Sequence, residues 1–297
     1  MRRLVLALLA TLGAGGAAAE DTAPAWQAVT LAHTEQRSVH SRHTGRDYRI
    51  FVARPQQEPP AAGYPVLFVL DGNALFPTLA LQAQALEARP APALRDSVLV
   101  VGIGYPNTQL YDFEARAEDY TPDAADRQRF LAFIEDELKP LIAARYRVDP
   151  SRQTLFGHSY GGLFTLYALL ERPQAFSGYV AASPSIWWYQ GFVERRLSAF
   201  ERRAGKAAPR AQLLITAGSA EEPQAGDPLS DPRQRHLAER RMVGNARETA
   251  QRLAAVAGLR VDLRINAGAN HGTNAQYSTI QALELASRVG RAAAEAD

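Results

Sequence analysis

The chain has 297 residues, of which 46% are hydrophobic and 22% are charged, and it contains no cysteine. This composition is typical of a globular protein with a core large enough for a rigid active site, and it is a poor match to disordered, collagen-like or coiled-coil chains. The absence of cysteine excludes a disulfide scaffold, a thiolate metal site and a thiol nucleophile. The formal charge of +2 gives no reason to expect nucleic acid, although 31 of the 33 basic residues are arginine.

The first twenty residues have the pattern of a secretory signal peptide. Arg2 and Arg3 precede an apolar run at residues 4–12, and small residues then end at Ala19. The run is well short of the ~20 residues that a membrane-spanning helix needs, so a membrane anchor is the weaker interpretation. We expect a signal peptide at residues 1–19, a single domain at residues 20–297, and a mature protein that is periplasmic or secreted and not inserted in a membrane. Cleavage would remove two arginines and no acid, so the mature chain would be formally neutral.

Seven short stretches have the composition of β-strands that are buried on both faces of a sheet. Their apolar residues are continuous or nearly so, as in parallel sheets that helices cover on both sides. The stretches are residues 48–53, 65–70, 97–103, 154–156, 179–182, 213–216 and 261–265.

Helical patterns lie between these stretches. Residues 74–88 are rich in Ala and Leu, and residues 123–146 place Phe130, Phe133 and Ile134 at spacings of three and four. Further helices are expected at residues 162–170, 232–257 and 275–291. Strands that alternate with helices indicate crossover units and a largely parallel sheet, so the predicted fold class is α/β.

Residues 157–162, Gly-His-Ser-Tyr-Gly-Gly, follow an apolar strand and begin an apolar helix. In that context G-x-S-x-G is a nucleophile elbow, a turn so sharp that only small residues fit beside the serine. Ser159 would then stand above the sheet at a helix N-terminus, where backbone N–H groups and the helix dipole favour a developing anion. The alternative is a serine that caps the helix, with glycines that serve packing only.

A serine nucleophile needs a general base that a third group holds in place. In enzymes with this elbow, the acid and then the histidine follow the serine along the chain. Of the six histidines, only His271 follows the last predicted strand, in a glycine-rich loop before the final helix, so we expect His271 to be the base. The others are expected to be surface or hydrogen-bonded structural residues. A metal site built from His33, His40 and His43 is the weaker interpretation.

The acid should lie just past the strand at residues 213–216, where Glu221 and Glu222 stand side by side. One of the two can reach the Nδ1 atom of His271 and fix its tautomer. We favour Glu221 and expect the other glutamate to be solvated, and a Ser–His dyad without an acid is the alternative.

Two backbone N–H groups are needed to stabilise a tetrahedral oxyanion. One is expected from Tyr160, directly after the serine. The other is expected from Asn73, in a loop where Gly72 lets the backbone turn toward the serine. Asp71 stands where it can brace this loop, although an aspartate before a glycine is equally typical of an ordinary turn.

At these residues the sequence resembles the esterase D-type, or putative esterase, family of α/β-hydrolases. Within that family it is similar to the periplasmic esterases that open the trilactone ring of ferric enterobactin and salmochelin. The likeness covers about residues 29–292, nearly the whole mature chain. The matching segments are residues 45–50, 69–73, 102–105, 119–122, 133–140, 157–164 and 183–188, together with Arg116 and the loop of His271.

The resemblance implies an α/β-hydrolase fold with a mostly parallel central sheet, helices on both faces and a small helical cap region. It also implies a serine esterase that hydrolyses ester or lactone bonds of a ferric catecholate siderophore, an enterobactin-like trilactone, in the periplasm to help release iron. Ser159 and His271 would carry the catalysis, with no cofactor, no metal ligands and no nucleic acid. The family's acid position is less uniform, so the resemblance does not separate Glu221 from Glu222.

The arginine bias suggests how an anionic substrate would be held. A ferric catecholate carries negative charge on aromatic rings, and guanidinium groups both pair with charge and stack on rings. Arg116 is the first candidate for substrate binding, and Trp187 and Trp188 would supply an aromatic wall. Further arginines follow the tryptophan pair and the acid loop, in segments over the carboxyl edge of the sheet. The competing interpretation is that most of these arginines lie on solvated helix faces.

Two other functions are compatible with the sequence. A carboxylesterase of broader specificity, acting on feruloyl or short-acyl esters, would have the same fold and the same elbow. A periplasmic protein that binds a siderophore without cutting it would not need Ser159 and His271 in catalytic order, which argues against that alternative.

Overall fold

The computed structural model describes residues 26–90, 97–121, 127–189, 191–204 and 210–290. The expected signal peptide at residues 1–19 lies outside the described residues, as does the beginning of the helix expected at residues 123–146. The chain divides into two units, Met1–Thr30 and Leu31–Asp297. Of the first unit only residues 26–30 are described; they have no regular secondary structure, and Trp26 and Val29 are exposed.

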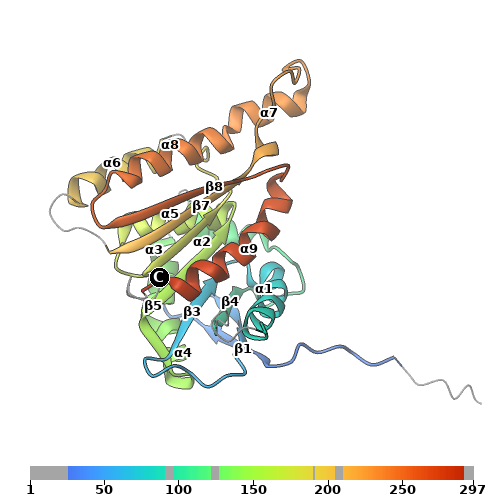
Figure 1. Cartoon of the computed structure of the whole chain (residues 1–297), viewed down its shortest axis with the longest axis vertical. Helices are drawn as coiled ribbons and strands as arrows, with labels where there is room; N and C mark the ends of the chain where they lie inside the picture. The colour runs from blue at the N-terminus through green and yellow to red at the C-terminus, as the bar shows by residue number, and fades with distance from the viewer. Residues whose placement is uncertain (1–25, 91–96, 122–126, 190, 205–209, 291–297) are drawn as a thin grey trace, which may run out of the picture. The chain divides into compact units, whose positions relative to one another are not determined.

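In the second unit the described strands form one eight-stranded sheet in the order β1-β2-β4-β3-β5-β6-β7-β8 (Figure 1). The β1–β2 and β2–β4 pairs are antiparallel and the other pairs are parallel, so the predicted largely parallel sheet is confirmed. The strands are β1 (Thr34–His40), β2 (Asp47–Ala53), β3 (Tyr64–Val69), β4 (Leu99–Gly104), β5 (Val148–His158), β6 (Gly178–Ala182), β7 (Ala211–Gly218) and β8 (Leu259–Asn266).

The seven predicted strands correspond to β2 through β8, and β1 is the strand that was not predicted. β1 is polar, lies at the edge of the sheet and pairs only with β2 in the described part of the chain. Most of its residues are exposed. An apolar run marks a strand buried on both faces, so a solvated edge strand does not carry that pattern.

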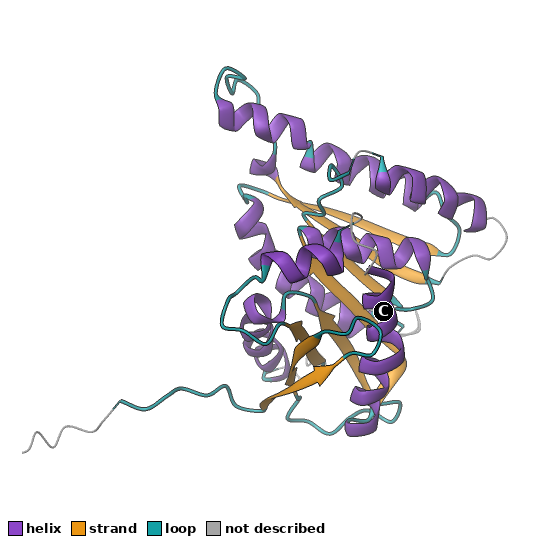
Figure 2. Cartoon of the chain, turned by 180° about the vertical axis from the view of Figure 1, so that it is seen from behind, coloured by secondary structure: helices purple, strands orange, loops and turns teal. Residues whose placement is uncertain are grey.

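Helices cover both faces of the sheet (Figures 1 and 2). Along β3, Phe68 enters one core, whereas Leu67 and Val69 enter the other, because successive side chains of a strand point to opposite faces. α5 (Tyr160–Glu171) and α8 (Met242–Ala254) contribute to the first core, and α1 (Gly72–Glu87) and α9 (His271–Arg288) contribute to the second. With both faces covered, the loops at the carboxyl ends of the parallel strands are the place for a site.

Two predicted helices are interrupted. The helix expected at residues 123–146 consists, where described, of α3 (Arg127–Ala132), a π-helical segment (Phe133–Leu138) and α4 (Lys139–Arg145). The helix expected at residues 232–257 is divided at Arg241, whose left-handed backbone has φ 46° and ψ 46°, into α7 (Pro232–Arg240) and α8. α7 buries none of its residues, whereas α8 buries an apolar face against β7 and β8. The break separates a solvated helix from one that packs on the sheet.

α2 (Phe113–Tyr120) and α6 (Phe192–Ala204) were not predicted. Both are rich in charged residues and carry only a few apolar side chains that face the core. They bear on the site because α2 carries Arg116 and α6 forms one wall of a cavity.

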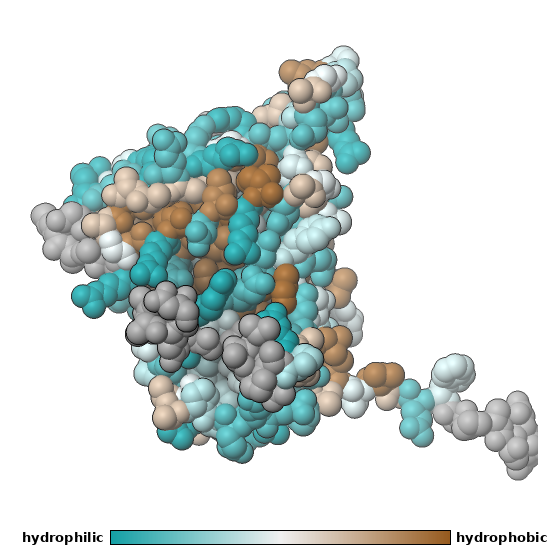
Figure 3. Space-filling view, in the orientation of Figure 1, coloured by the Kyte–Doolittle hydropathy of each residue, from teal (hydrophilic) through white to brown (hydrophobic). Residues whose placement is uncertain are grey.

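The surface of the face drawn in Figure 3 is mostly hydrophilic, with a band of hydrophobic residues beneath the row of α6 and α8. Among the described helices, none has both the length and the apolar character needed to cross a bilayer.

Candidate active site

Ser159 occupies a sharp turn between β5 and α5. Its φ and ψ are 59° and −115°, a conformation that residues with a side chain rarely adopt. A Cβ atom built on Gly157 would lie 2.2 Å from the carbonyl oxygen of Gly161. One built on Gly162 would lie 2.7 Å from the carbonyl oxygen of Ala182. The close approach of the backbone therefore excludes a side chain at Gly157, the first glycine of the G-x-S-x-G motif, and at Gly162, the residue directly after the motif.

Three side chains converge at the carboxyl edge of the sheet. Ser159 follows β5, Glu221 comes shortly after β7, and His271 begins α9 after β8. The Nε2 atom of His271 is 3.0 Å from Ser159 Oγ, and its Nδ1 atom is 2.7 Å from Glu221 Oε2. Because parallel strands end side by side, residues far apart in the chain meet here.

These hydrogen bonds assign the proton on His271. A carboxylate only accepts hydrogen bonds, so Nδ1 carries the proton and donates it to Glu221. In the neutral imidazole Nε2 is then an acceptor, and the hydroxyl of Ser159 donates to it. In this arrangement the histidine can take the proton of the serine hydroxyl as the oxygen attacks an electrophile.

Glu221 is 1% exposed and accepts hydrogen bonds from three donors. Besides His271, they are the hydroxyl of Ser183 at 2.6 Å and the N–H of Gly218 at 2.7 Å, both to Oε1. Asn274 donates in turn to the hydroxyl of Ser183 at 2.7 Å. A buried carboxylate fixed in this way holds the imidazole in one orientation.

Glu222 lies away from His271, so the structure separates the two candidate acids. Its Oε1 atom accepts a hydrogen bond from the N–H of Gly244 at 2.6 Å, at the start of α8. The backbone of Glu222 is extended, and in extended chain successive side chains point to opposite sides. Glu222 is thus half-buried and holds the start of α8, a contact that the expectation of a solvated glutamate did not include.

His158, directly before the serine, is a buried neighbour of His271. Its Nε2 atom donates to the carbonyl oxygen of His271 at 2.9 Å, and the two rings are 4.5 Å apart. Burial, with smaller contributions from His271 and Arg116, lowers the pKa of His158 to about 3 from an ordinary value of 6.5. His158 is thus a neutral donor that holds the backbone of His271. This contact was not predicted, because 113 positions separate the two residues in the chain.

The histidines considered for a metal site lie near the beginning of the sheet, and two of the three pair with separate acids. His40 lies 2.8 Å from a carboxylate oxygen of Asp47, and His43 lies 3.3 Å from one of Asp136. Within the described ranges, no group of three or more His, Asp or Glu side chains is arranged to hold a metal ion.

The loop after β3 lies beside the elbow. A Cβ atom built on Gly161 would lie 3.5 Å from Asp71 Oδ2. Asp71 has a left-handed φ of 53° and precedes α1, whose first N–H groups have no partner within the helix. Asn73 is in this first turn, as Tyr160 is in the first turn of α5. Two helix N-termini therefore begin next to Ser159, and their dipoles favour an anion.

The side chain of Asn73 holds the loop after β4. Its Oδ1 atom accepts a hydrogen bond from the N–H of Tyr105 at 2.9 Å. Its Nδ2 atom donates to the carbonyl oxygens of Tyr105, Asn107 and Gln109. The side chain is engaged in these contacts, so a role in stabilising an oxyanion falls to the backbone N–H of Asn73.

Arg116 is buried and engaged with Asp71, which contradicts the expectation that it binds substrate. Its Nε and Nη2 atoms donate to the two carboxylate oxygens of Asp71 at 2.8 Å each, and the two residues are 5% and 2% exposed. Burial lowers the pKa of Arg116, but the charge and hydrogen bonds of Asp71 outweigh burial and hold that pKa above its usual value. The guanidinium also lies over the rings of Tyr111, Tyr120 and Tyr160. The pair therefore braces the loop that carries Asn73.

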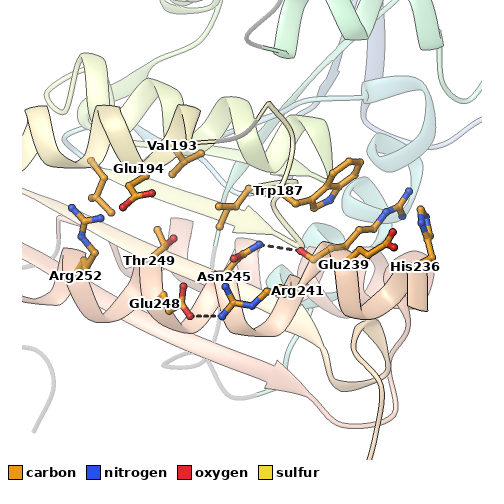
Figure 4. Close-up of a pocket in the computed structure, with 14 residues that line it drawn as sticks. Trp187, Val193, Glu194, His236, Glu239, Arg241, Asn245, Glu248, Thr249 and Arg252 are labelled. Carbon is orange, nitrogen blue, oxygen red and sulfur yellow. Dashed lines mark hydrogen bonds and ion pairs between the residues drawn. The ribbon is translucent and has the colours of Figure 1, made fainter. Parts of the chain in front are cut away.

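Trp187 and Trp188 follow β6, in the loop that brings the hydroxyl of Ser185 to 3.3 Å from that of Ser159. The ring of Trp188 is centred 5.0 Å from that of Tyr160, and the two tryptophan rings are 5.4 Å apart. Trp187 lines a cavity of about 560 Å³ between α6, α7 and α8 (Figure 4). The tryptophan pair thus forms an aromatic wall beside the elbow.

Three residues that support the site were not predicted as site residues: Ser183, Ser185 and Asn274. The two serines stand just past β6, which lies between β5 and β7 in the sheet. Ser159 follows β5, and β6 is the next strand in the sheet. Residues just past β6 therefore lie close to Ser159, and this position could have identified the two serines. Asn274 becomes recognisable only once the start of α9 is known, because it lies one turn after His271.

The buried pair of Arg116 and Asp71 gives a prediction about stability. In Arg116→Met the carboxylate of Asp71 is left buried without a partner, and we expect a loss of about 3–5 kcal/mol in the free energy of unfolding. Adding Asp71→Asn should recover part of the loss, because the unpaired charge is then gone. Urea unfolding of the single and double variants measures this coupling. A loss below about 1 kcal/mol, as for exposed ion pairs, would contradict a structural role.

The low pKa of His158 gives a prediction about pH. Between its folded value of about 3 and its ordinary value of 6.5, the unfolded chain binds a proton at His158 and the folded chain does not. The contribution of His158 to the free energy of unfolding therefore falls by about 1.4 kcal/mol for each pH unit below roughly 6. In His158→Gln the decrease in unfolding free energy from about pH 7 to about pH 4.5 should be smaller by roughly 2–3 kcal/mol. Identical pH dependence in the two proteins, measured by urea unfolding, would contradict a neutral buried imidazole.

Comparison with known proteins places this geometry in a family. A family model described as "Putative esterase" matches residues 41–252. The ferri-bacillibactin esterase BesA of Bacillus subtilis is 35% identical over 263 residues, which cover 82% of this chain and 86% of that protein. A siderophore triacetylfusarinine C esterase of Aspergillus fumigatus is 38% identical over 197 residues, which cover 61% of this chain and 67% of that protein.

Solved structures agree with the fold. The siderophore hydrolase EstB of Aspergillus nidulans aligns with a TM-score of 0.79 at 28% identity, and the BES protein of Bacillus cereus aligns with a TM-score of 0.78 at 31% identity. Each alignment covers 90% of this chain and 99% of the other. The predicted α/β-hydrolase fold and the resemblance to siderophore esterases are confirmed. The chain belongs to the putative esterase family of hydrolases.

Proposed function

We propose that the protein is a serine esterase that hydrolyses ester or lactone bonds of a ferric catecholate siderophore, with an enterobactin-like trilactone as substrate. The observation that carries this proposal is the alignment of Ser159, His271 and Glu221 through contacts of 3.0 and 2.7 Å. A siderophore ester as substrate is supported by relatives whose names specify bacillibactin and triacetylfusarinine C, and by an apo-salmochelin esterase of Escherichia coli that is 34% identical over 172 residues.

The first half of the reaction transfers the acyl group to the enzyme. His271 Nε2 takes the proton of Ser159 as the serine oxygen attacks the ester carbonyl, and the carbonyl oxygen becomes an oxyanion. Glu221 stabilises the imidazolium that forms. The backbone N–H groups of Asn73 and Tyr160 would stabilise the oxyanion, at two helix N-termini where negative charge is favoured.

The second half of the reaction restores the serine. When the tetrahedral intermediate collapses, the bond to the leaving alcohol breaks, and His271 gives that alcohol the proton taken from Ser159. A water molecule then attacks the acyl-enzyme with His271 as base, and the acid product leaves. Iron enters this scheme as part of the substrate, and the residues that carry the reaction belong to this chain.

We also propose that the protein acts in the periplasm, as a single catalytic domain at residues 20–297. The support is the signal-peptide pattern at residues 1–19, where a basic start, an apolar run and small residues follow one another.

Replacement of Glu221 and Glu222 in separate variants tests the catalytic acid. In Glu221→Gln a neutral amide replaces the charge that stabilises the imidazolium of His271, and we expect kcat to fall on the order of 10⁴-fold. Glu222→Gln keeps an oxygen that can accept from the N–H of Gly244, so kcat should stay within about twofold of wild type. Steady-state kinetics on both variants measures the difference. Similar losses in the two variants would be evidence against Glu221 as the acid.

The substrate class is tested by comparing ferric enterobactin with p-nitrophenyl butyrate. We expect kcat/KM for the siderophore to exceed that for the simple ester by roughly 100-fold or more, because a built site rejects ligands that leave its polar groups unpaired. Ser159→Ala should lose about 10⁶-fold in kcat while it still binds the siderophore.

Each alternative function has its own outcome in this experiment. The reverse substrate preference would identify a carboxylesterase of broader specificity. Failure of a fluorophosphonate to label Ser159, together with tight binding of the siderophore, would identify a non-catalytic binding protein. Hydrolysis retained in Ser159→Ala would overturn the assignment of the nucleophile.

A further inference from the structure

The cavity next to the tryptophan pair has two chemically different ends. It has a volume of about 560 Å³ and lies between α6, α7 and α8. Trp187, His236 and Glu239 lie at one end, and Glu194 and Arg252 lie at the other (Figure 4). Small-molecule pockets typically measure about 300–1,000 Å³, so the cavity is large enough to take part of a ligand.

Arg240 is held over the face of Trp187. Its guanidinium carbon lies 4.6 Å from the centre of the indole ring. Its Nε atom is buried and has no hydrogen-bond partner in the described part of the chain. No carboxylate within the described ranges pairs with its guanidinium. A cation is thus fixed on an aromatic surface, with a buried N–H that no acceptor among the described residues uses.

The other arginines of the cavity are neutralised within the protein. Arg241 pairs with Glu248 on α8, and Arg252 pairs with Glu201 on α6. Arg240, at the Trp187 end of the cavity, therefore differs from these two arginines: in the described structure it has no ion-pair partner.

A run of aromatic rings connects this end of the cavity to the nucleophile. The ring of Tyr160, the residue after Ser159, is 5.0 Å from that of Trp188, and the Trp188 ring is 5.4 Å from that of Trp187. None of the residues that line the cavity is the nucleophile itself. The cavity therefore adjoins the reacting centre and can hold a part of the substrate that does not react.

The charges around the cavity select the kind of group that fits. Glu194 and Glu239 also line it, so there is no excess of positive charge to attract anions in general. A compact anion would make no use of the flat surface that Trp187 and the guanidinium stacked on it present, and a neutral alkyl group would gain nothing from the charge of Arg240. A planar aromatic ring with an anionic oxygen would gain from both, through stacking and through charge.

We infer that Trp187 and Arg240 form a subsite for one anionic aromatic arm of the substrate, which distinguishes the iron-bound catecholate from the iron-free catechol. This inference rests on the proposed function and deepens it. In the ferric complex the phenolic oxygens are deprotonated and carry negative charge, whereas in the iron-free ligand they keep their protons. Arg240 therefore favours the ferric form, and Trp187 contributes to the binding of both.

Dissociation constants measured by calorimetry in the Ser159→Ala background test the subsite without turnover. Adding Arg240→Gln should raise the Kd for ferric enterobactin by about 5- to 30-fold, and the Kd for iron-free enterobactin by less than about twofold. Arg240→Lys should give an intermediate value, because the charge remains but the planar stack on Trp187 is lost. Trp187→Leu should weaken both forms.

A matched control is Arg247→Gln, which removes an exposed arginine from α8 outside the cavity lining and should leave both dissociation constants unchanged. Equal thermal unfolding midpoints for all variants would exclude misfolding as the cause of weaker binding.

An unchanged Kd in Arg240→Gln, or equal losses of affinity for the ferric and iron-free forms, would overturn the subsite. If the wild-type enzyme hydrolyses ferric enterobactin in that case, the proposed function stands and only the subsite fails. If the wild-type enzyme hydrolyses neither form and the Ser159→Ala protein binds neither, both are wrong.

Discussion

The sharp turn at Ser159 is the constraint on which the rest of the site depends. A residue other than glycine that has a positive φ in a sparsely populated region costs on the order of 1–3 kcal/mol, and other interactions must offset that strain. The N–H of Ser159 donates to the carbonyl of Ala182 on the neighbouring strand at 2.9 Å, and α5 buries nearly all of its residues directly after the turn. The nucleophile is therefore held by the sheet and the helix themselves. His271 and Glu221 need only reach it from the ends of two strands in the same parallel array.

Several charged side chains near the site fix loops and helices in place. Arg116 is the clearest case: a residue expected to meet the substrate instead neutralises Asp71 beneath the loop that carries Asn73. If the signal peptide is cleaved as expected, the mature chain has no net charge, so attraction of an anionic ligand depends on where individual cations stand. Arg240 stacks on Trp187 and has no carboxylate partner in the described structure. Its position therefore says more about where an anionic ligand binds than the number of arginines in the chain does.

Much of the fold could be predicted, because buried parallel strands and amphipathic helices leave periodic apolar patterns. β1 could not, because a polar edge strand has no such pattern, and neither could the break at Arg241, which depends on how α8 meets the sheet. In the site, the elbow and the order of serine, acid and histidine follow from local motifs. The choice between Glu221 and Glu222 depends on the direction of the backbone after β7, and the partners of Arg116 and His158 depend on contacts between distant segments.

The way Asn73 is held has a consequence for how this scaffold can change during evolution. Its side-chain amide binds the main-chain groups of the loop after β4, at Tyr105, Asn107 and Gln109, and not their side chains. Such a clamp does not depend on which amino acids the loop carries, provided that the loop keeps its path. Substitutions in that loop can therefore alter the surface next to the site while the first turn of α1 stays where it is. The same catalytic frame can in this way be adapted to ligands of different shape.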